Sequence, residues 1–430
     1  MNKFLILTIL LLQGCFNSSN YEFRLETIND SGIDTCSENF GFNPGTWTSE
    51  LACGLVDWSA NPWGTQQDGL EGRDALALRG VLSKIGSGLA GFDYTRMNHF
   101  GHPLTLQNIA WNENGVEESG EIWDCVRDNV TGLWWETKRA DPTHIRYQGH
   151  LYTWFNSDQS TNGGDVGTEI GGSCLGVNDL TMCNTNSYVT AINNTNLCGH
   201  NDWRLPTIEE LMSLAHRGRT NGQQGIDTNN FPNTSSQWTW SSTPDVTCPT
   251  CAWDINFGNS NLFDNVDHKD TAYSVRLVRG ASKIYSSNTR FKSVTEGSDS
   301  EILDTLTGLV WQRCAIGMNW NGATCTGTPN SYSWREALSY AQTLSETNLT
   351  GKKWRLPSVV ELYSISDHLQ DSPAINTQWF PQTPAIWTWS SSPNVQIPNQ
   401  AWFVGFSAGY TGTDSVDALY PIRMVRNNTK

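Results

Sequence analysis

The chain contains an internal duplication, which constrains its fold more than any other feature. Five short blocks of the first half return in the same order in the second half. They begin at Thr131, Trp203, Trp238, Ala252 and Tyr273 in the first copy, and at Thr307, Trp354, Trp387, Ala401 and Tyr420 in the second. The third and fourth blocks have the same spacing, with 15 residues from Trp238 to Trp253 and from Trp387 to Trp402. A repeat that keeps its order and spacing predicts two equivalent structural units.

Local patterns predict the elements of each copy. Thr207 and Ser358 follow a proline and precede a glutamate by three residues, as in a helix capping box, and Ser333 opens a third such pattern. The apolar residues that share one helical face after the first box are Ile208, Leu211, Met212 and Ala215. The Trp-Thr-Trp-Ser-Ser, Ala-Trp and closing blocks alternate with period two and predict strands. Helices combined with antiparallel strands place each copy in the α+β class.

Tryptophan occurs 20 times, and most of these rings are expected in the core rather than at a binding surface. The rings expected to be buried are Trp203, Trp240, Trp253, Trp354, Trp389 and Trp402. The arginines of the repeated blocks are expected to form internal ion pairs or hydrogen bonds. These arginines are Arg204, Arg276, Arg355 and Arg423.

The repeated blocks resemble the Lcl C-terminal domain family, the C-terminal module of a collagen-like bacterial adhesin. The resemblance rests on Asp-x-x-Thr-Gly-Leu-x-Trp (from Asp128 and from Asp304), on Trp-Arg-Leu-Pro before a helix, on Trp-Ser-Ser, and on the closing Arg-Leu/Met-Val-Arg. It implies two tandem C-type-lectin-like domains, each with two helices packed on short antiparallel strands and stapled by disulfides. This fold is shared with formylglycine-generating enzymes. We expect the domains to span residues 66–280 and 281–430.

The start of the chain predicts export and lipid anchoring. Lys3 precedes an apolar stretch from Phe4 to Leu12, which is too short to span a bilayer and is typical of a secretory signal. Leu12-Gln-Gly-Cys resembles a bacterial lipobox, although Gln13 is larger than usual for its position. We expect residues 1–14 to be a lipoprotein signal peptide, Cys15 to be lipidated, and residues 15–65 to form a tether with a disulfide. An ordinary signal peptide with a chance cysteine is the alternative.

This N-terminal pattern predicts a location at the bacterial outer membrane, facing either the periplasm or the cell surface. Phe16 rather than Asp follows the cysteine, which favours the outer over the inner membrane in enteric-type sorting. Several acyl chains on one cysteine would anchor the protein firmly, where a single chain binds only marginally.

Cysteine number supports export. Lipidation of one of the 11 cysteines leaves an even number, as a set of disulfides in an oxidising compartment requires. The expected pairs are Cys36–Cys53, Cys125–Cys198, Cys174–Cys183, Cys248–Cys251 and Cys314–Cys325. A redox or zinc motif is the alternative for Cys248 and Cys251.

Charge excludes one class of partner. The chain has 43 acidic and 27 basic residues and a net charge of −16, so it lacks the excess of cations that nucleic-acid binding requires. Electrostatic docking to anionic lipid is disfavoured for the same reason.

The sequence contains none of the catalytic motifs that we considered. The closing strands contain no cysteine for the copper-binding thiol pair of a formylglycine-type oxidase, and no P-loop, Gly-x-Ser-x-Gly or His-Glu-x-x-His pattern occurs. His99 and His102 are interpreted as a surface-loop pair rather than half of a metal site. We therefore expect no catalytic residue, cofactor or metal.

Binding residues are expected in the divergent segments between the Ala-Trp and closing blocks, where Asn, Ser and Tyr resemble the adaptable residues of recognition loops. The candidates are Asn256, Asn259, Asn261, Phe263, Ser407, Tyr410, Thr411 and Asp414. Loop drift after duplication is the alternative. The predicted function is non-catalytic binding of an extracellular glycan or protein, including as an adhesin. A structural or assembly component of the envelope is the second interpretation, and a formylglycine-type oxidase-like enzyme the third.

Overall fold

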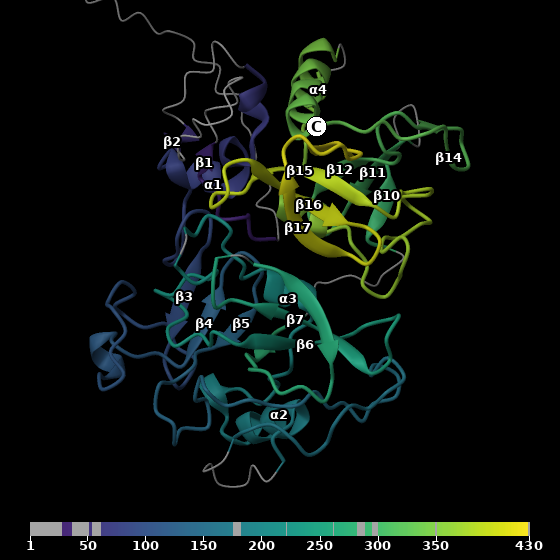
Figure 1. Cartoon of the computed structure of the whole chain (residues 1–430). Coiled ribbons are helices and arrows are strands. Elements are labelled where there is room, and N and C mark those ends of the chain that lie inside the picture. The colour runs from purple at the N-terminus through teal and green to yellow at the C-terminus, as the bar shows by residue number, and fades with distance from the viewer. Residues whose placement is uncertain are drawn as a thin grey trace, which may run out of the picture.

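The computed structural model describes most of the chain from residue 28 onward (Figure 1). The described ranges are 28–36, 51–53, 62–174, 182–220, 222–260, 262–281, 289–294, 300–348 and 351–428. The predicted signal peptide, Cys15 and most of the predicted tether lie outside these ranges. In the described part, no helix is long and apolar enough to cross a membrane.

The first copy contains two small antiparallel sheets. One has the order β3-β4-β5-β9 and the other the order β6-β7-β8. The strands of the first sheet are β3 (Tyr94–Met97), β4 (Cys125–Asp128), β5 (Trp134–Glu136) and β9 (Val278–Arg279). Those of the second are β6 (Trp238–Pro244), β7 (Cys251–Asn256) and β8 (Asp264–His268). The helices of this copy are α2 (Thr185–Asn194) and α3 (Ile208–Met212), and α1 (Gly72–Leu78) precedes it.

The second copy repeats this plan, with one sheet of order β10-β11-β12-β18 and one of order β15-β16-β17. The strands of its first sheet are β10 (Phe291–Ser293), β11 (Glu301–Asp304), β12 (Leu309–Gln312) and β18 (Val425–Asn427). Those of its second are β15 (Trp387–Pro393), β16 (Gln400–Gly405) and β17 (Tyr410–Ser415). Its helices are α4 (Trp334–Thr347) and α5 (Val359–Tyr363). Two short hairpins, β1–β2 (Thr35–Cys36, Leu51–Ala52) and β13–β14 (Asn319–Trp320, Cys325–Thr326), complete the described α-helices and strands. The predicted α+β class is confirmed.

The predicted helix starts are confirmed. Thr207, Ser333 and Ser358 each cap a helix, and the glutamate three residues later bonds back to the backbone of the capping residue. The first of these helices is shorter than its apolar pattern predicts. It ends at Met212, because the next residues bond in tighter turns, with Ala215 N donating to Met212 O at 3.1 Å. Ala215 is still buried, since the chain turns toward the core.

The repeated tryptophans and arginines have the internal roles expected of them. The six tryptophans are at most 5% exposed. Arg204 pairs with Glu210 and Arg355 pairs with Glu361 in the same bidentate geometry. Arg276 and Arg423 donate to backbone carbonyls of the neighbouring strands. All five expected disulfides are present.

The two copies share one continuous apolar core, which includes Trp253 and Ile255 of the first copy and Trp402 and Val404 of the second. Between them, β8 and β17 come together: the backbone N–H of Thr411 donates to Asp264 Oδ1 at 2.9 Å. The two repeats therefore pack against each other through a common core and are not separate domains joined only by a linker.

Part of the predicted tether is built into this body. Ser31 and Ile33 are fully buried, and Asn29 donates to Asp128 of the first copy at 2.6 Å. Ser31 and Ser392 both donate to the buried carboxylate of Asp68, which ties the N-terminal segment to the second copy. Figure 1 shows α1 and the β1–β2 hairpin beside the second copy. Residues 28–36 are thus part of the core rather than of a free spacer.

Candidate functional site

The structure brings two of the predicted binding residues, Thr411 and Phe263, to the contact between the copies. Thr411 is 2% exposed and its hydroxyl donates to Asp264 at 2.8 Å, so it is not available to an external ligand. Phe263 lies 6.3 Å from the ring of Trp402. These two positions of the predicted surface therefore take part in the packing of one copy on the other.

The remaining predicted residues have mixed surroundings. Asn256 accepts a hydrogen bond from the backbone of Gly258, Tyr410 accepts one from Trp387, and Asp414 accepts one from Tyr420. Ser407 is half-buried and Asn259 is exposed. Asn261 lies outside the described residues.

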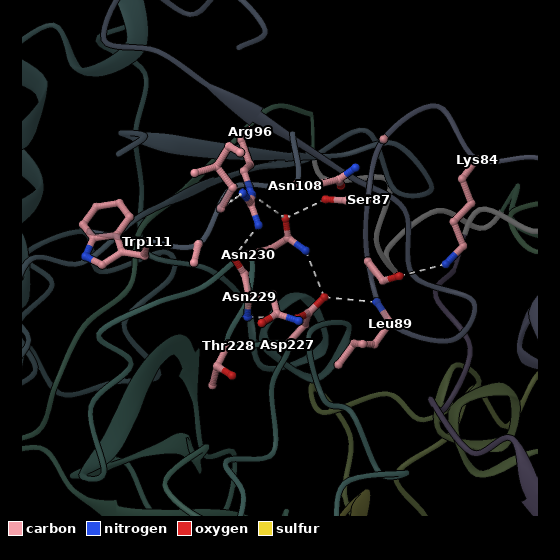
Figure 2. A pocket seen from close by; sticks show the side chains of 14 residues that line it. Lys84, Ser87, Leu89, Arg96, Asn108, Trp111, Asp227, Thr228, Asn229 and Asn230 are labelled. Atoms are coloured by element: carbon pink, nitrogen blue, oxygen red, sulfur yellow. Dashed lines mark hydrogen bonds between the residues drawn. The ribbon is translucent and has the colours of Figure 1, made fainter. Parts of the chain in front are cut away.

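An open cleft of about 500 Å³ lies elsewhere in the first copy (Figure 2). Three segments that are distant in sequence form it: residues 84–89, 108–111 and 227–230, with Arg96 from β3. The first two segments flank β3, and the third follows α3. Its lining combines polar side chains, among them Ser87, Asn108 and Asn229, with apolar ones, among them Leu89, Ile109 and the ring of Trp111.

Hydrogen bonds among its own residues hold the cleft in shape. Asp227 Oδ2 accepts from the backbone of Leu89 at 3.1 Å and from Asn230 at 2.9 Å. Asn230 Oδ1 in turn accepts from Ser87 at 2.9 Å and from Arg96 Nε at 3.2 Å. The side chains at the base of the cleft therefore join residues 84–89, residues 227–230 and Arg96 of β3.

Both cations of the cleft are also bound within it. Arg96 donates to the backbone carbonyls of Ile109 and Asn229, and its guanidinium lies 4.0 Å from the ring centre of Trp123. Burial lowers the pKa of Arg96 to about 10, which leaves it charged at neutral pH. Lys84 donates to the carbonyl of Gly88 at 3.0 Å, and burial lowers its pKa.

A polar network fixes Trp111. The indole N–H donates to Glu113 at 3.1 Å, and Arg139 donates to the other oxygen of that carboxylate at 2.8 Å. Burial opposes the ionisation of Glu113, but the hydrogen bonds from Arg139, the backbone of Ala140 and Trp111, together with the charge of Arg139, outweigh burial and lower the pKa of Glu113. The half-buried ring of Trp111 also packs edge-on against Trp123, with 4.8 Å between ring centres. It is therefore positioned before any ligand arrives.

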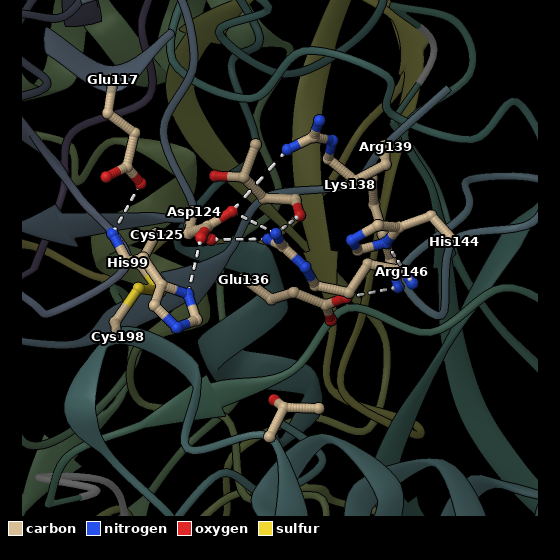
Figure 3. Close-up of polar contacts among 12 residues, drawn as sticks. His99, Glu117, Asp124, Cys125, Glu136, Lys138, Arg139, His144, Arg146 and Cys198 are labelled. Carbon is tan, nitrogen blue, oxygen red and sulfur yellow. Dashed lines mark hydrogen bonds and ion pairs between the residues drawn. A yellow bond between two sulfur atoms is a disulfide. The ribbon is translucent and has the colours of Figure 1, made fainter. Parts of the chain in front are cut away.

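The network continues behind this wall (Figure 3). Asp124 accepts from Arg146 and from His99 Nδ1, the latter at 3.1 Å. Burial raises the pKa of Asp124, but Arg146 outweighs burial and keeps the pKa below its usual value. The neighbouring Cys125 is joined to Cys198, so neither sulfur is a free nucleophile for the His99–Asp124 pair. This arrangement is that of a structural support.

Among the described residues, one group of three His, Cys, Asp or Glu side chains is close enough to hold a metal ion together. Cys248, Cys251 and His268 lie within 4.8 Å of one another, but the two sulfurs form a disulfide. In this oxidised state the group cannot supply thiolate ligands.

The cleft was not predicted from the sequence, although one signal was present. Residues 98–124 connect β3 to β4, whereas only residues 294–300 connect the equivalent β10 and β11. This insertion carries the cleft wall around Asn108 and Trp111.

Comparison with known protein families shows to which family the chain belongs. The Lcl C-terminal domain matches residues 124–279 and residues 300–426, which together make up more than half of the chain. The chain belongs to the Lcl C-terminal domain family. Neither a curated protein nor a solved structure matches it. Within this Lcl C-terminal domain protein, the cleft joins residues 227–230 of the first family segment to residues 84–111, which precede that segment.

Proposed function

We propose that this protein is a non-catalytic component of the bacterial envelope that binds an extracellular carbohydrate in the cleft of the first copy. The observation that carries this proposal is the fixed ring of Trp111, which lines the cleft together with the exposed residues Asn108 and Asn229. An aromatic face with a few polar groups at its edges is the usual chemistry of a small-ligand site, and it suits the apolar and hydroxyl faces of a sugar ring.

The hydrogen bonding of the charged groups supports binding over catalysis. Asp227 and Arg96 are engaged by neighbouring residues, so neither is poised to transfer a proton or attack a substrate. Neutral amides and one aromatic ring remain for contact with a ligand. These groups recognise hydroxyl-bearing molecules without changing them.

The proposal also covers the fold of each copy and the cellular location of the protein. In the described part of each copy, two α-helices together with one four-stranded and one three-stranded antiparallel sheet support a C-type-lectin-like fold. Five disulfides indicate an extracytoplasmic protein. Lipidation of Cys15 and attachment to the outer membrane complete this assignment, and loss of labelled-acyl incorporation in Cys15→Ser tests it.

A glycan array followed by titration tests the binding function. We expect saturable binding by the purified chain from residue 21, weakened about fivefold or more by Trp111→Ala because a stacking ring is worth on the order of 1 kcal/mol or more. Asn229→Ala should also weaken it. Asn259→Ala is the control, because Asn259 is exposed but lies outside the cleft. Loss of binding in Asn259→Ala with full binding in Trp111→Ala would move the site to the β7–β8 loop.

A protein ligand is the second candidate, and one observation favours it. Ile85 is 84% exposed and Ile109 is 37% exposed, and both lie in the segments that form the cleft. Exposed apolar side chains around a pocket are typical of protein-binding surfaces. A protein ligand would lose affinity in Ile85→Ser, whereas a glycan seated on Trp111 would not.

A further inference from the structure

In the second sheet of each copy, a tyrosine, an aspartate and a tryptophan make the same contacts, and we call this group of three residues the frame. In the first copy, Tyr273 donates to Asp267 at 2.6 Å and packs 4.9 Å from Trp240. In the second copy, Tyr420 donates to Asp414 and packs 4.8 Å from Trp389. The two frames are equivalent because Asp267 pairs with Ala252 on β7 and Asp414 pairs with Ala401 on β16.

The second copy fills the middle of this frame with an aromatic ring. Phe403 pairs with Trp389 on one side and Gly412 on the other, and its ring stacks on Trp387 with 4.6 Å between centres. A Cβ atom on Gly412 would lie 2.5 Å from the Phe403 ring, so glycine is needed opposite the phenylalanine. The site is apolar and closed.

The first copy has a carboxylate in the same position. Asp254 pairs with Trp240 and Asn265, which are the counterparts of Trp389 and Gly412. Directly opposed residues of antiparallel strands point to the same face of a sheet, so Asp254 and Asn265 face the side that carries Asp267. One copy thus has Phe and Gly where the other has Asp and Asn.

The Asp254 carboxylate has no partner in the described chain. It is fully buried, and neither of its oxygens accepts a hydrogen bond. Asn265 donates instead to Asp267, at 2.9 Å. Burial and the charges of Asp267 and Asp264 raise the pKa of Asp254 to about 8. A buried carboxylate without hydrogen bonds is strongly disfavoured, so a partner from outside the chain would resolve this arrangement.

We infer that Asp254, Asn265 and Asp267 form a binding site for a hard divalent cation, Ca²⁺, on the first copy alone. Two oxygens of Asp254, Oδ1 of Asp267 and the amide oxygen of Asn265 lie on one sheet face, and carboxylate and amide oxygens are the ligands that Ca²⁺ takes. The cation neutralises the two carboxylates that otherwise repel each other. Half-buried Asn256 and Trp238 lie at the edge, where water completes the coordination.

Terbium luminescence on the full chain tests the site directly, because Tb³⁺ replaces Ca²⁺ at oxygen ligands and is sensitised by a nearby indole. We expect saturable sensitised emission that Ca²⁺ displaces at about 0.1–1 mM, the range of extracellular calcium modules. Asp254→Asn should lower the Tb³⁺ affinity at least about tenfold. Asp414→Asn, at the counterpart of Asp267, should leave it unchanged.

A double variant that carries residues of the second copy in the first copy separates loss of the cation site from loss of folding. The double variant Asp254→Phe with Asn265→Gly gives the first copy the pair of residues found in the second, so it should fold without a cation. We expect added Ca²⁺ to raise the Tm of the wild-type chain and to leave that of the double variant unchanged. The inference is overturned if the wild-type chain gives no sensitised emission, or if Asp254→Asn binds Tb³⁺ as the wild-type chain does. The carbohydrate cleft is separate, so Trp111→Ala should retain the emission.

Discussion

Arg217 and His368 occupy the same position in the two copies, and each packs on a tryptophan of the other copy. Both follow the Trp of their Trp-Arg-Leu-Pro block by 14 residues. The Arg217 guanidinium lies 5.1 Å from the ring centre of Trp402, and the His368 ring lies 4.8 Å from that of Trp253. These two tryptophans are themselves equivalent, so the copies exchange matching contacts. The exchange differs at one point, because His368 also pairs with Glu209 at 2.7 Å.

This ion pair predicts a pH-dependent stability. Burial favours neutral His368, but Glu209 outweighs burial and raises the pKa of His368. In return, His368 outweighs burial and lowers the pKa of Glu209. A histidine with a raised folded pKa contributes its full stability below the unfolded pKa of about 6.5, and this contribution is lost as the pH rises through the folded value. We expect the free energy of unfolding to fall as the pH rises above about 6.5.

Urea unfolding of wild type and His368→Gln at about pH 6 and about pH 9 measures this effect. The variant should lose about 3–5 kcal/mol at the lower pH, because Glu209 is left buried and unpaired. The difference between the two proteins is the informative quantity, since buried Asp68, whose pKa is raised to about 8 by burial and nearby Asp30, also destabilises the fold as pH rises. A difference that does not shrink with rising pH would contradict the ion pair.

The burial of the N-terminal segment predicts a large cost for a small change there. Ile33 is fully buried in the core shared by the two copies, so Ile33→Ala should lower the free energy of unfolding by about 2–5 kcal/mol. Ile85→Ala is the control: Ile85 is 84% exposed, and its truncation should change stability by less than about 0.5 kcal/mol. Equal effects of the two substitutions would place residues 28–36 outside the core.

The disulfides should differ in what they contribute. Cys125–Cys198 closes a separation of 73 residues and Cys248–Cys251 one of 3. Loop-closure entropy then predicts about 4 kcal/mol for the first and about 2 kcal/mol for the second. Replacing each pair by alanine and measuring urea unfolding checks the order. A larger loss for the short loop would show that it has a role besides restricting the unfolded chain.

Arg96 should be replaceable by no other cation. Arg96→Lys keeps a positive charge but cannot reach Asn230, the Ile109 carbonyl and the Asn229 carbonyl together. We expect a loss of about 1–3 kcal/mol in unfolding free energy together with weaker ligand binding, because residues 108–111 and 227–230 lose the donor that joins them. Calorimetric unfolding and ligand titration measure the two effects. Arg127→Lys, at a solvent-exposed position of β4, provides the control.

Much of the fold could be predicted because its signals are local. A capping box such as Thr207 to Glu210 lies within four residues, and short-range cysteine pairs follow from spacing. Because the blocks repeat, an element predicted in one copy could also be predicted at the equivalent position of the other copy. The sequence pattern predicted too long a helix for α3, because the apolar residues after Met212 are buried by a turn rather than by a longer helix.

The candidate site could not be predicted because it depends on long-range packing. Asp227 meets Leu89 only after two distant segments have folded together. Thr411 is polar and lies in a divergent segment, as a recognition residue would, yet its partner is Asp264 of the other copy. The isolation of Asp254 becomes visible only once the strand register places it opposite Asn265.

The matching contacts of Arg217 and His368 have an evolutionary meaning. When a surface meets its own copy around a two-fold axis, each residue contacts the same partner from both sides, and the interface is isologous. The two repeats meet in this way within a single polypeptide, with Asp264 and Thr411 at equivalent positions beside the approximate axis. The chain has the form of a fused homodimer whose halves differ in sequence: one half has an arginine where the other has the histidine that pairs with Glu209.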